Sequence, residues 1–297
     1  IEKLIGEQGT DTFRFENGAD IGGSITGGSG GGNTLDYALY TTALDIVFSG
    51  AAVEGYSGEE ATTGDSFTGI NTIVGGSASD ILTTLNSDSE FTISGDNAGS
   101  YLTDGYTLEF AGVDNLKAGS DSDTFIFTGA GKLSGFVSAG GGVDTMDYGQ
   151  YDSGVTVNLA NGSASNINNG AAWMVAGFEN LIGSQYDDSL TGDNGVNVIT
   201  GNKGNDILNG NGGDDTYIFA DDWGIDILTE ASGGGSDTLD FTAVTTDMVF
   251  TIGADYFINS DGNTLNHSGG QLEQLLGGSG NDTFAFIGSG IINGSID

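Results

Sequence analysis

Aspartate recurs at one fixed place in short, glycine-rich blocks of this sequence. Residues 183–218 divide into four consecutive blocks of nine, GSQYDDSLT, GDNGVNVIT, GNKGNDILN and GNGGDDTYI. Each block opens with glycine, and the residues at its sixth place are, in order, Asp188, Asn197, Asp206 and Asp215. Carboxylate and carbonyl oxygens are the ligands that Ca²⁺ prefers, in flexible cages of six to eight oxygens. The spacing therefore predicts several calcium sites repeated along the chain.

The same blocks predict the backbone that must position these ligands. The eighth place is always large and apolar, with Leu190, Ile199, Leu208 and Tyr217 in turn. A polar glycine turn followed by such a residue favours a very short strand, and two consecutive blocks make one coil. Glycine, 55 of 297 residues, recurs too often for helices. We expect an all-β fold, a right-handed parallel β-solenoid with coils of about 18–22 residues and almost no helix.

Similar blocks occur outside the tandem run, and their sixth-place acids extend the set of candidate ligands. The blocks lie at 6–14, 75–83, 118–126, 139–147, 221–229, 232–240 and 277–285. With those of the tandem run, the sixth-place residues are Asp11, Asp80, Asp123, Asp144, Asp188, Asn197, Asp206, Asp215, Asp226, Asp237 and Asp282. An isolated acid after glycines is also a common turn former. For the isolated blocks a plain turn and a half-built metal site both stay open.

Stacking such turns places carboxylates at the spacing of neighbouring strands, about 4.8 Å. Carboxylates this close repel one another unless a cation lies between them. We therefore expect the metal-free chain to be unfolded or loosely collapsed, and several Ca²⁺ ions to be part of the fold. Asp188 with Asp206 is the better predicted pair, since Asn197 contributes no charge to the site it shares with Asp215.

Composition excludes several functional classes. The formal net charge is −37, from 42 acidic and 5 basic residues, so we predict no nucleic-acid partner, because such contacts need Lys and Arg. There is no cysteine, which removes disulfides, zinc thiolate sites and cysteine nucleophiles. No stretch approaches the roughly 20 apolar residues of a membrane span, so we predict no membrane insertion.

Two alternative functions remain compatible with a solenoid of this kind. A β-solenoid polysaccharide lyase or epimerase, or its calcium-binding accessory module, would need clustered basic groups to stabilise developing charge. The basic residues are scattered singly, at Lys3, Arg14, Lys117, Lys132 and Lys203, so we predict that the protein is not an enzyme. Threonines at the seventh place would point outward and could bind ice or carbohydrate, although a plain β-branched ladder is the commoner cause of such a pattern.

The blocks resemble the nonapeptide repeats of the repeats-in-toxin (RTX), haemolysin-type calcium-binding proteins, whose pattern is G-G-x-G-x-D-x-U-x. GGSGNDTFA at 277–285 matches every specified place. The tandem run 183–218 departs from the pattern at the second place, with Ser184, Asp193, Asn202 and Asn211, and at Tyr186. The resemblance implies a calcium β-roll in which the sixth-place residues are the side-chain ligands.

The resemblance also implies a function and a location. Because the chain resembles giant bacterial RTX adhesins and extracellular fibres, we expect residues 1–297 to be one elongated solenoid segment of a longer array, with 183–218 as its tandem core. The last residues stop inside a coil, so we expect the ends to meet neighbouring modules or further copies. Cell-surface or matrix polysaccharide is a further candidate partner. The implied location is extracellular or at the bacterial cell surface, after type I secretion of an unfolded chain.

Overall fold

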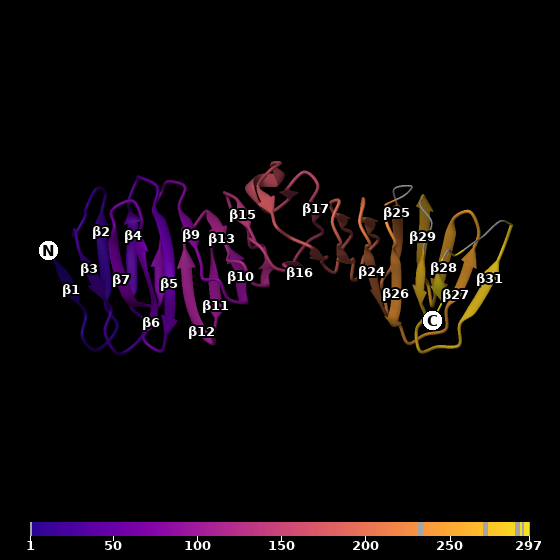
Figure 1. The fold of residues 1–297 in the computed structure, drawn as a ribbon, viewed down its shortest axis with the longest axis horizontal. Coiled ribbons are helices and arrows are strands. Elements are labelled where there is room, and N and C mark those ends of the chain that lie inside the picture. Colours follow the sequence, from indigo (N-terminus) through magenta and orange to yellow (C-terminus); the bar gives the residue numbers. More distant parts are fainter. Residues whose placement is uncertain (1, 231–233, 270–272, 289–291, 293, 297) are drawn as a thin grey trace. The chain divides into compact units, whose positions relative to one another are not determined.

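The computed structural model describes residues 2–230, 234–269, 273–288, 292 and 294–296. Almost all of its regular structure is β (Figure 1), and the one helical element within these residues is a 3₁₀ turn at Asn168–Gly170. No helix among them is long and apolar enough to cross a bilayer. The prediction of an all-β fold with almost no helix is confirmed. Parts of the 232–240 block and of the C-terminal segment lie outside the described residues.

The chain forms two compact units, each built from two sheets. The first unit comprises Ile1–Asp144 and Asn166–Gly177, and the second comprises Thr145–Ser165 and Phe178–Asp297. In each unit, aromatic rings from the two sheets meet in the core, as do Phe48 and Tyr101 in the first and Phe241 and Phe250 in the second. That residues 1–297 make one elongated solenoid stays a prediction.

The first unit pairs its strands mainly in parallel. One sheet has the order β1 (Lys3–Ile5), β3 (Ser24–Thr26), β7 (Asp65–Ile70), β6 (Gly55–Glu60), β5 (Asp45–Ala52), β9 (Ile81–Thr83), β13 (Asn115–Lys117), β15 (Val137–Ser138) and β19 (Val175–Ala176). The other has the order β2 (Thr12–Glu16), β4 (Thr34–Leu39), β8 (Thr72–Val74), β12 (Tyr106–Ala111), β11 (Ala98–Thr103), β10 (Ser89–Gly95) and β14 (Asp123–Gly129).

The second unit contains the tandem blocks. One of its sheets has the order β16 (Thr145–Tyr151), β20 (Asn180–Ile182), β22 (Val198–Thr200), β24 (Thr216–Ala220), β26 (Thr238–Ala243), β30 (Gln274–Leu276) and β32 (Ser295–Ile296). The other has the order β18 (Ser163–Ala164), β17 (Thr156–Asn158), β21 (Ser189–Thr191), β23 (Ile207–Asn209), β25 (Ile225–Glu230), β29 (Asn263–Gly269), β28 (Tyr256–Ser260), β27 (Val249–Ile252) and β31 (Thr283–Phe286).

Coil length follows from the parallel register. Asn180 pairs with Val198, and Val198 pairs with Thr216, so neighbouring strands of the tandem run are 18 residues apart. The next step, from Thr216 to Thr238, is 22 residues. Both values confirm the coil length predicted from the blocks. Other steps are longer, reaching 42 residues between Ser24 and Ser66, because extra strands are inserted there.

The inserted strands form antiparallel meanders that the repeat pattern did not predict. In the first unit, β5, β6 and β7 make one meander in one sheet, while β10, β11 and β12 make another in the opposite sheet. The two meanders pack against each other, since the hydroxyl of Tyr56 in β6 donates a hydrogen bond to the carbonyl of Tyr106 in β12 at 2.6 Å. Each sheet of the first unit thus contains one meander.

The eighth-place residues form the core of the tandem coils. Leu190, Ile199, Leu208 and Tyr217 are 0% exposed. Each strand is only three to five residues long here, so this single inward position supplies most of the strand's apolar burial.

The outward-facing threonines form only broken ranks. Thr12, Thr34 and Thr72 are aligned in the first unit. In the second unit, the rank beginning at Thr145 continues through Asn180 and Val198 before it returns to threonine. The continuous threonine face that an ice-binding surface needs is therefore interrupted in this rank.

We expect Leu208→Ala to lower the free energy of unfolding by about 2–5 kcal/mol, because it opens a cavity in a buried row. Ile207→Ala, on the same strand but with the side chain 50% exposed, is the matched control and should cost less than about 1 kcal/mol. Urea unfolding of both variants in the same calcium-containing buffer measures the difference. Equal losses would contradict the assigned inward and outward positions.

Candidate metal centre

A chain of hydrogen bonds links the sixth-place residues from one coil to the next. The backbone N–H of Asp188 donates to Oδ1 of Asp206 at 2.8 Å, and the N–H of Asp206 donates to Oδ1 of Asp226 at 2.9 Å. The N–H of Val155 donates to Oδ1 of Asp188 at 2.7 Å, which extends this row by one coil. Each acid thus lies beneath the backbone of the preceding coil, at the start of β21, β23 or β25.

A second row runs before the strands of the other sheet. The N–H of Asn197 donates to Oδ1 of Asp215 at 2.8 Å, and the N–H of Asp215 donates to Oδ1 of Asp237 at 3.0 Å. The N–H of Asp237 donates to Oε2 of Glu273 at 2.9 Å. The structure therefore brings Asn197, Asp215 and Asp237 together, as their spacing predicted, and adds Glu273.

The isolated blocks also have polar partners in the next coil. The N–H of Asp123 donates to Oδ1 of Asp144 at 2.7 Å, and that of Asp80 donates to Oδ2 of Asp114 at 2.9 Å. The N–H of Asp11 donates to the side-chain oxygen of Asn33 at 3.0 Å. In these isolated blocks, too, the sixth-place N–H donates to a polar side chain one coil further along the sheet.

Burial separates the predicted ligands into two groups. Asp11 and Asp282 are half-buried, and Asp282 accepts a hydrogen bond from the N–H of Met248 at 3.0 Å. The others are at most 4% exposed, namely Asp80, Asp123, Asp144, Asp188, Asn197, Asp206, Asp215, Asp226 and Asp237. Carboxylates this deeply buried need donors or cations around them.

The first-place glycine provides the space in which the acid sits. A Cβ on Gly201 would lie 2.3 Å from Oδ2 of Asp206, far inside van der Waals contact. A Cβ on Gly183 would lie 2.5 Å from Oδ2 of Asp188 and 2.6 Å from the carbonyl oxygen of Gly201 in the next coil. Beside Gly183, carboxylate and carbonyl oxygens from two coils therefore converge on one small volume, which is the donor set that suits Ca²⁺.

The second-place residue decides whether the acid is already satisfied. The N–H of Ser184 donates to Oδ2 of Asp188 at 2.6 Å, and its hydroxyl lies 2.9 Å from Oδ1. Both oxygens of Asp188 therefore have protein partners. Asp188 is thus the more hydrogen-bonded member of its predicted pair with Asp206.

Asparagine at the second place has a different effect. Asn202 and Asn211 have φ of 68° and 71°, a left-handed conformation that asparagine tolerates better than most residues. Their side-chain amides donate to the carbonyl oxygens of Gly183 and Gly192 in the preceding coil, at 2.6 and 2.8 Å. The amides clamp adjacent turns together.

Several buried carboxylate oxygens of the second unit have no hydrogen-bond partner. They are Oδ2 of Asp206, Asp215 and Asp226 and Oε2 of Glu230. The ion pairs found in the described part of the chain lie elsewhere, joining Arg14 to Asp36, Lys132 to Asp96 and Lys203 to Asp222. The unpartnered oxygens, the all-oxygen donor set and the lack of an ion pair to these acids among the described residues fit a bound Ca²⁺.

Burial raises the pKa of these carboxyl groups well above the ordinary value. Burial, together with the charges of Asp226 and Asp188, raises the pKa of Asp206 to about 8. Burial likewise raises the pKa of Asp226 to about 7 and that of Asp215 to about 6. The pKa values of Asp80, Asp123, Asp188, Glu230 and Asp237 are also raised, in each case chiefly by burial. Without a cation, neutral carboxyl groups suit these positions better than charged ones.

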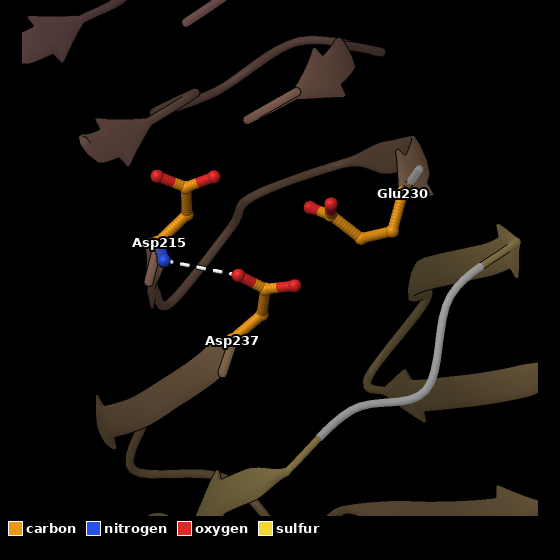
Figure 2. Close-up of side chains that lie close together, drawn as sticks. All are labelled: Asp215, Glu230 and Asp237. Atoms are coloured by element: carbon orange, nitrogen blue, oxygen red, sulfur yellow. Dashed lines mark hydrogen bonds between the residues drawn. The ribbon is translucent and has the colours of Figure 1, made fainter. Parts of the chain in front are cut away.

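Three acids of the site were missed by the sequence pattern. Asp114 and Glu273 each begin an acid, amide, leucine triplet, DNL or EQL, which recurs before the blocks and could have identified them. Glu230 has no such signal. It forms, with Asp215 and Asp237, the one group of three carboxylates within the described residues whose oxygens lie within 4.8 Å of one another (Figure 2).

Comparison with protein families matches residues 182–217 to a model described as the RTX calcium-binding nonapeptide repeat, in four copies. The match covers the predicted tandem core, 183–218, to within one residue at each end. No match emerged among curated proteins. The resemblance predicted from the blocks is confirmed for these coils, and it supports Ca²⁺ as their ion.

We expect Gly201→Ala to displace the Asp206 carboxylate, because the new Cβ takes the space of Oδ2. Overpacking of this kind costs about 1–3 kcal/mol, and calcium affinity should fall with it. Gly141→Ala is the control, since a Cβ there meets nothing within 4 Å. Denaturant unfolding and calcium titration of both variants measure the effect, and an unchanged Gly201→Ala variant would contradict the assigned packing.

The raised pKa values predict how metal-free stability depends on pH. A carboxyl whose pKa is higher in the folded state binds more protons there, so the stability it contributes is lost as pH rises through the folded pKa. The free energy of unfolding in calcium-free buffer should fall between about pH 4 and about pH 8, by at most about 1.4 kcal/mol per pH unit for each group. Urea unfolding at the acid end, and circular dichroism toward neutral pH where we expect the metal-free chain to lose its fold, test the sign. A stability that rises toward pH 8 would contradict it.

Proposed function

We propose that this chain is a calcium-stabilised structural segment of a large secreted or cell-surface bacterial protein, where it spaces or attaches other modules. The observation that carries the proposal is the pair of buried acid rows, with unpartnered oxygens and no basic side chain against them in the described residues. Such a row is unfavourable by itself and becomes favourable once divalent cations lie between the coils.

Calcium then couples ligand binding to folding. The ligands of one site come from successive coils, so an unfolded chain cannot present them together. The free energy of binding therefore becomes free energy of folding. Five basic residues against 42 acidic ones leave a net charge of −37, so we expect the metal-free chain to be unfolded or loosely collapsed at neutral pH.

This coupling suits export. A chain that stays unfolded at low calcium can cross a secretion channel and fold in the calcium-rich medium outside. The type I route, the bacterial surface location and the adhesive or fibre-forming role are parts of this proposal supported by the resemblance to RTX proteins. Pairing of the ends with further copies, and contact with matrix polysaccharide, have the same support.

The lyase or epimerase function is not favoured by the arrangement of basic groups. Arg14, Lys132 and Lys203 each pair with an acid on a different strand or turn, and among the residues that the structure describes no cluster of them faces the acid rows. The proposal therefore assigns a mechanical role to the acids and no catalytic one.

We expect circular dichroism to show a disordered spectrum in EGTA and a β spectrum after excess Ca²⁺ is added at neutral pH. A metal-free chain that is already fully folded, and does not respond to Ca²⁺, would refute the proposal. Asp206→Asn should raise the calcium concentration at the folding midpoint about tenfold or more, since it removes a buried charged ligand. Asp152→Asn, at an exposed position, removes the same charge and should leave the midpoint unchanged.

A further inference from the structure

Three buried carboxylates from three separate segments converge in the second unit (Figure 2). Asp215 and Asp237 precede β24 and β26, which belong to one sheet, whereas Glu230 ends β25 in the other sheet. The group therefore joins two sixth-place acids to an acid that has no place in the nonapeptide pattern. It also lies where the coil lengthens from 18 to 22 residues.

Glu230 occupies the coil position that glycine has in the preceding coil. Leu208 of β23 pairs with Leu228 of β25, and two residues further along, the same offset aligns Gly210 with Glu230. The chain thus has a long acidic side chain where the preceding coil has a first-place glycine. A glutamate here can reach back toward Asp215, which a glycine cannot do.

The surroundings of Gly210 show what this replacement changes. In the preceding turn, a Cβ on Gly192 would meet Oδ1 of Asn197 at 2.2 Å and the carbonyl oxygen of Gly210 at 2.7 Å. At Gly210 itself, the corresponding Cβ would meet Oδ2 of Asp215 at 2.1 Å and the hydroxyl of Tyr217 at 2.6 Å. At Gly210, the Tyr217 hydroxyl, which is hydrogen-bonded to Glu230, thus lies where Gly192 has the carbonyl oxygen of the first-place glycine of the next coil.

Tyr217 fixes the position of Glu230. Its hydroxyl donates a hydrogen bond to Oε1 of Glu230 and accepts one from the N–H of Gly210 at 2.5 Å. The second oxygen of Glu230, Oε2, has no partner, and neither has Oδ2 of Asp215. Glu230 is 7% exposed and Asp215 is 1% exposed, so these are unpartnered oxygens of buried side chains directed into one group.

We propose that Asp215, Glu230 and Asp237 hold one Ca²⁺ at a site whose composition differs from that of the repeat sites. The inference rests on the calcium role proposed above. Three carboxylates give this site more negative charge than a pair of sixth-place residues does, and calcium affinity rises with ligand charge. This site therefore binds Ca²⁺ more tightly than the repeat site formed by Asp188 and Asp206. Its ion connects β25 of one sheet to β24 and β26 of the other.

The test is a calcium titration of the full chain, followed calorimetrically and by circular dichroism. Wild type should show one tight ion that binds before the others. Glu230→Gln should lower the affinity for that ion by about a hundredfold or more and leave the weaker ions in place. It removes the charge of a direct ligand, whereas the loss of a group that only orients a ligand already lowers metal affinity about tenfold. Glu54→Gln, at an exposed position in the first unit, is the charge-matched control and should leave the tight ion unchanged.

Tyr217→Phe keeps all three carboxylates and removes only the hydroxyl that orients Glu230, so it decides the question if Glu230→Gln does not fold. It should weaken the tight ion about tenfold. A tight phase that survives unchanged in the folded variants contradicts this site and leaves the calcium role intact. No calcium response in wild type contradicts the proposed function itself.

Discussion

The hydrogen bond from each sixth-place N–H to the acid of the next coil is the interaction on which the tandem coils depend. It sets the register between coils and, at the same time, buries a carboxylate at every step of the row. Parallel strands spaced about 4.8 Å apart then stack like charges at close range. The fold gains a close alignment of turns and carries an electrostatic cost that only protons or cations can remove.

Local features of the turns follow from this constraint. Glycine stands at the first place because the carboxylate of the same block fills the space of its Cβ. Asparagine can stand at the second place because it accepts a left-handed backbone, and its amide then clamps the preceding turn. Ser184 instead satisfies Asp188 directly. Small changes at this one place thus decide which acids keep an oxygen for a metal ion.

The tandem coils could be predicted from sequence because both their ligands and their core residues repeat within one short block. The spacing of Asp188 and Asp206 gives the coil length, and Leu190 and Leu208 give the inward face. The meanders and the third ligand could not be predicted in this way. Glu230 joins Asp215 only through the register between β23 and β25, and Glu273 joins Asp237 across 36 residues, so no local pattern contains either contact. Long-range strand pairing, which depends on the whole core, decides them.

The most direct measurement is an anomalous-difference map from crystals grown with calcium, collected at a wavelength where calcium scatters anomalously. The account predicts peaks between successive coils of the acid rows, within coordination distance of Oδ2 of Asp206. A folded chain whose rows carry no metal peak there, with the carboxyl groups bonded only to protein, would contradict it.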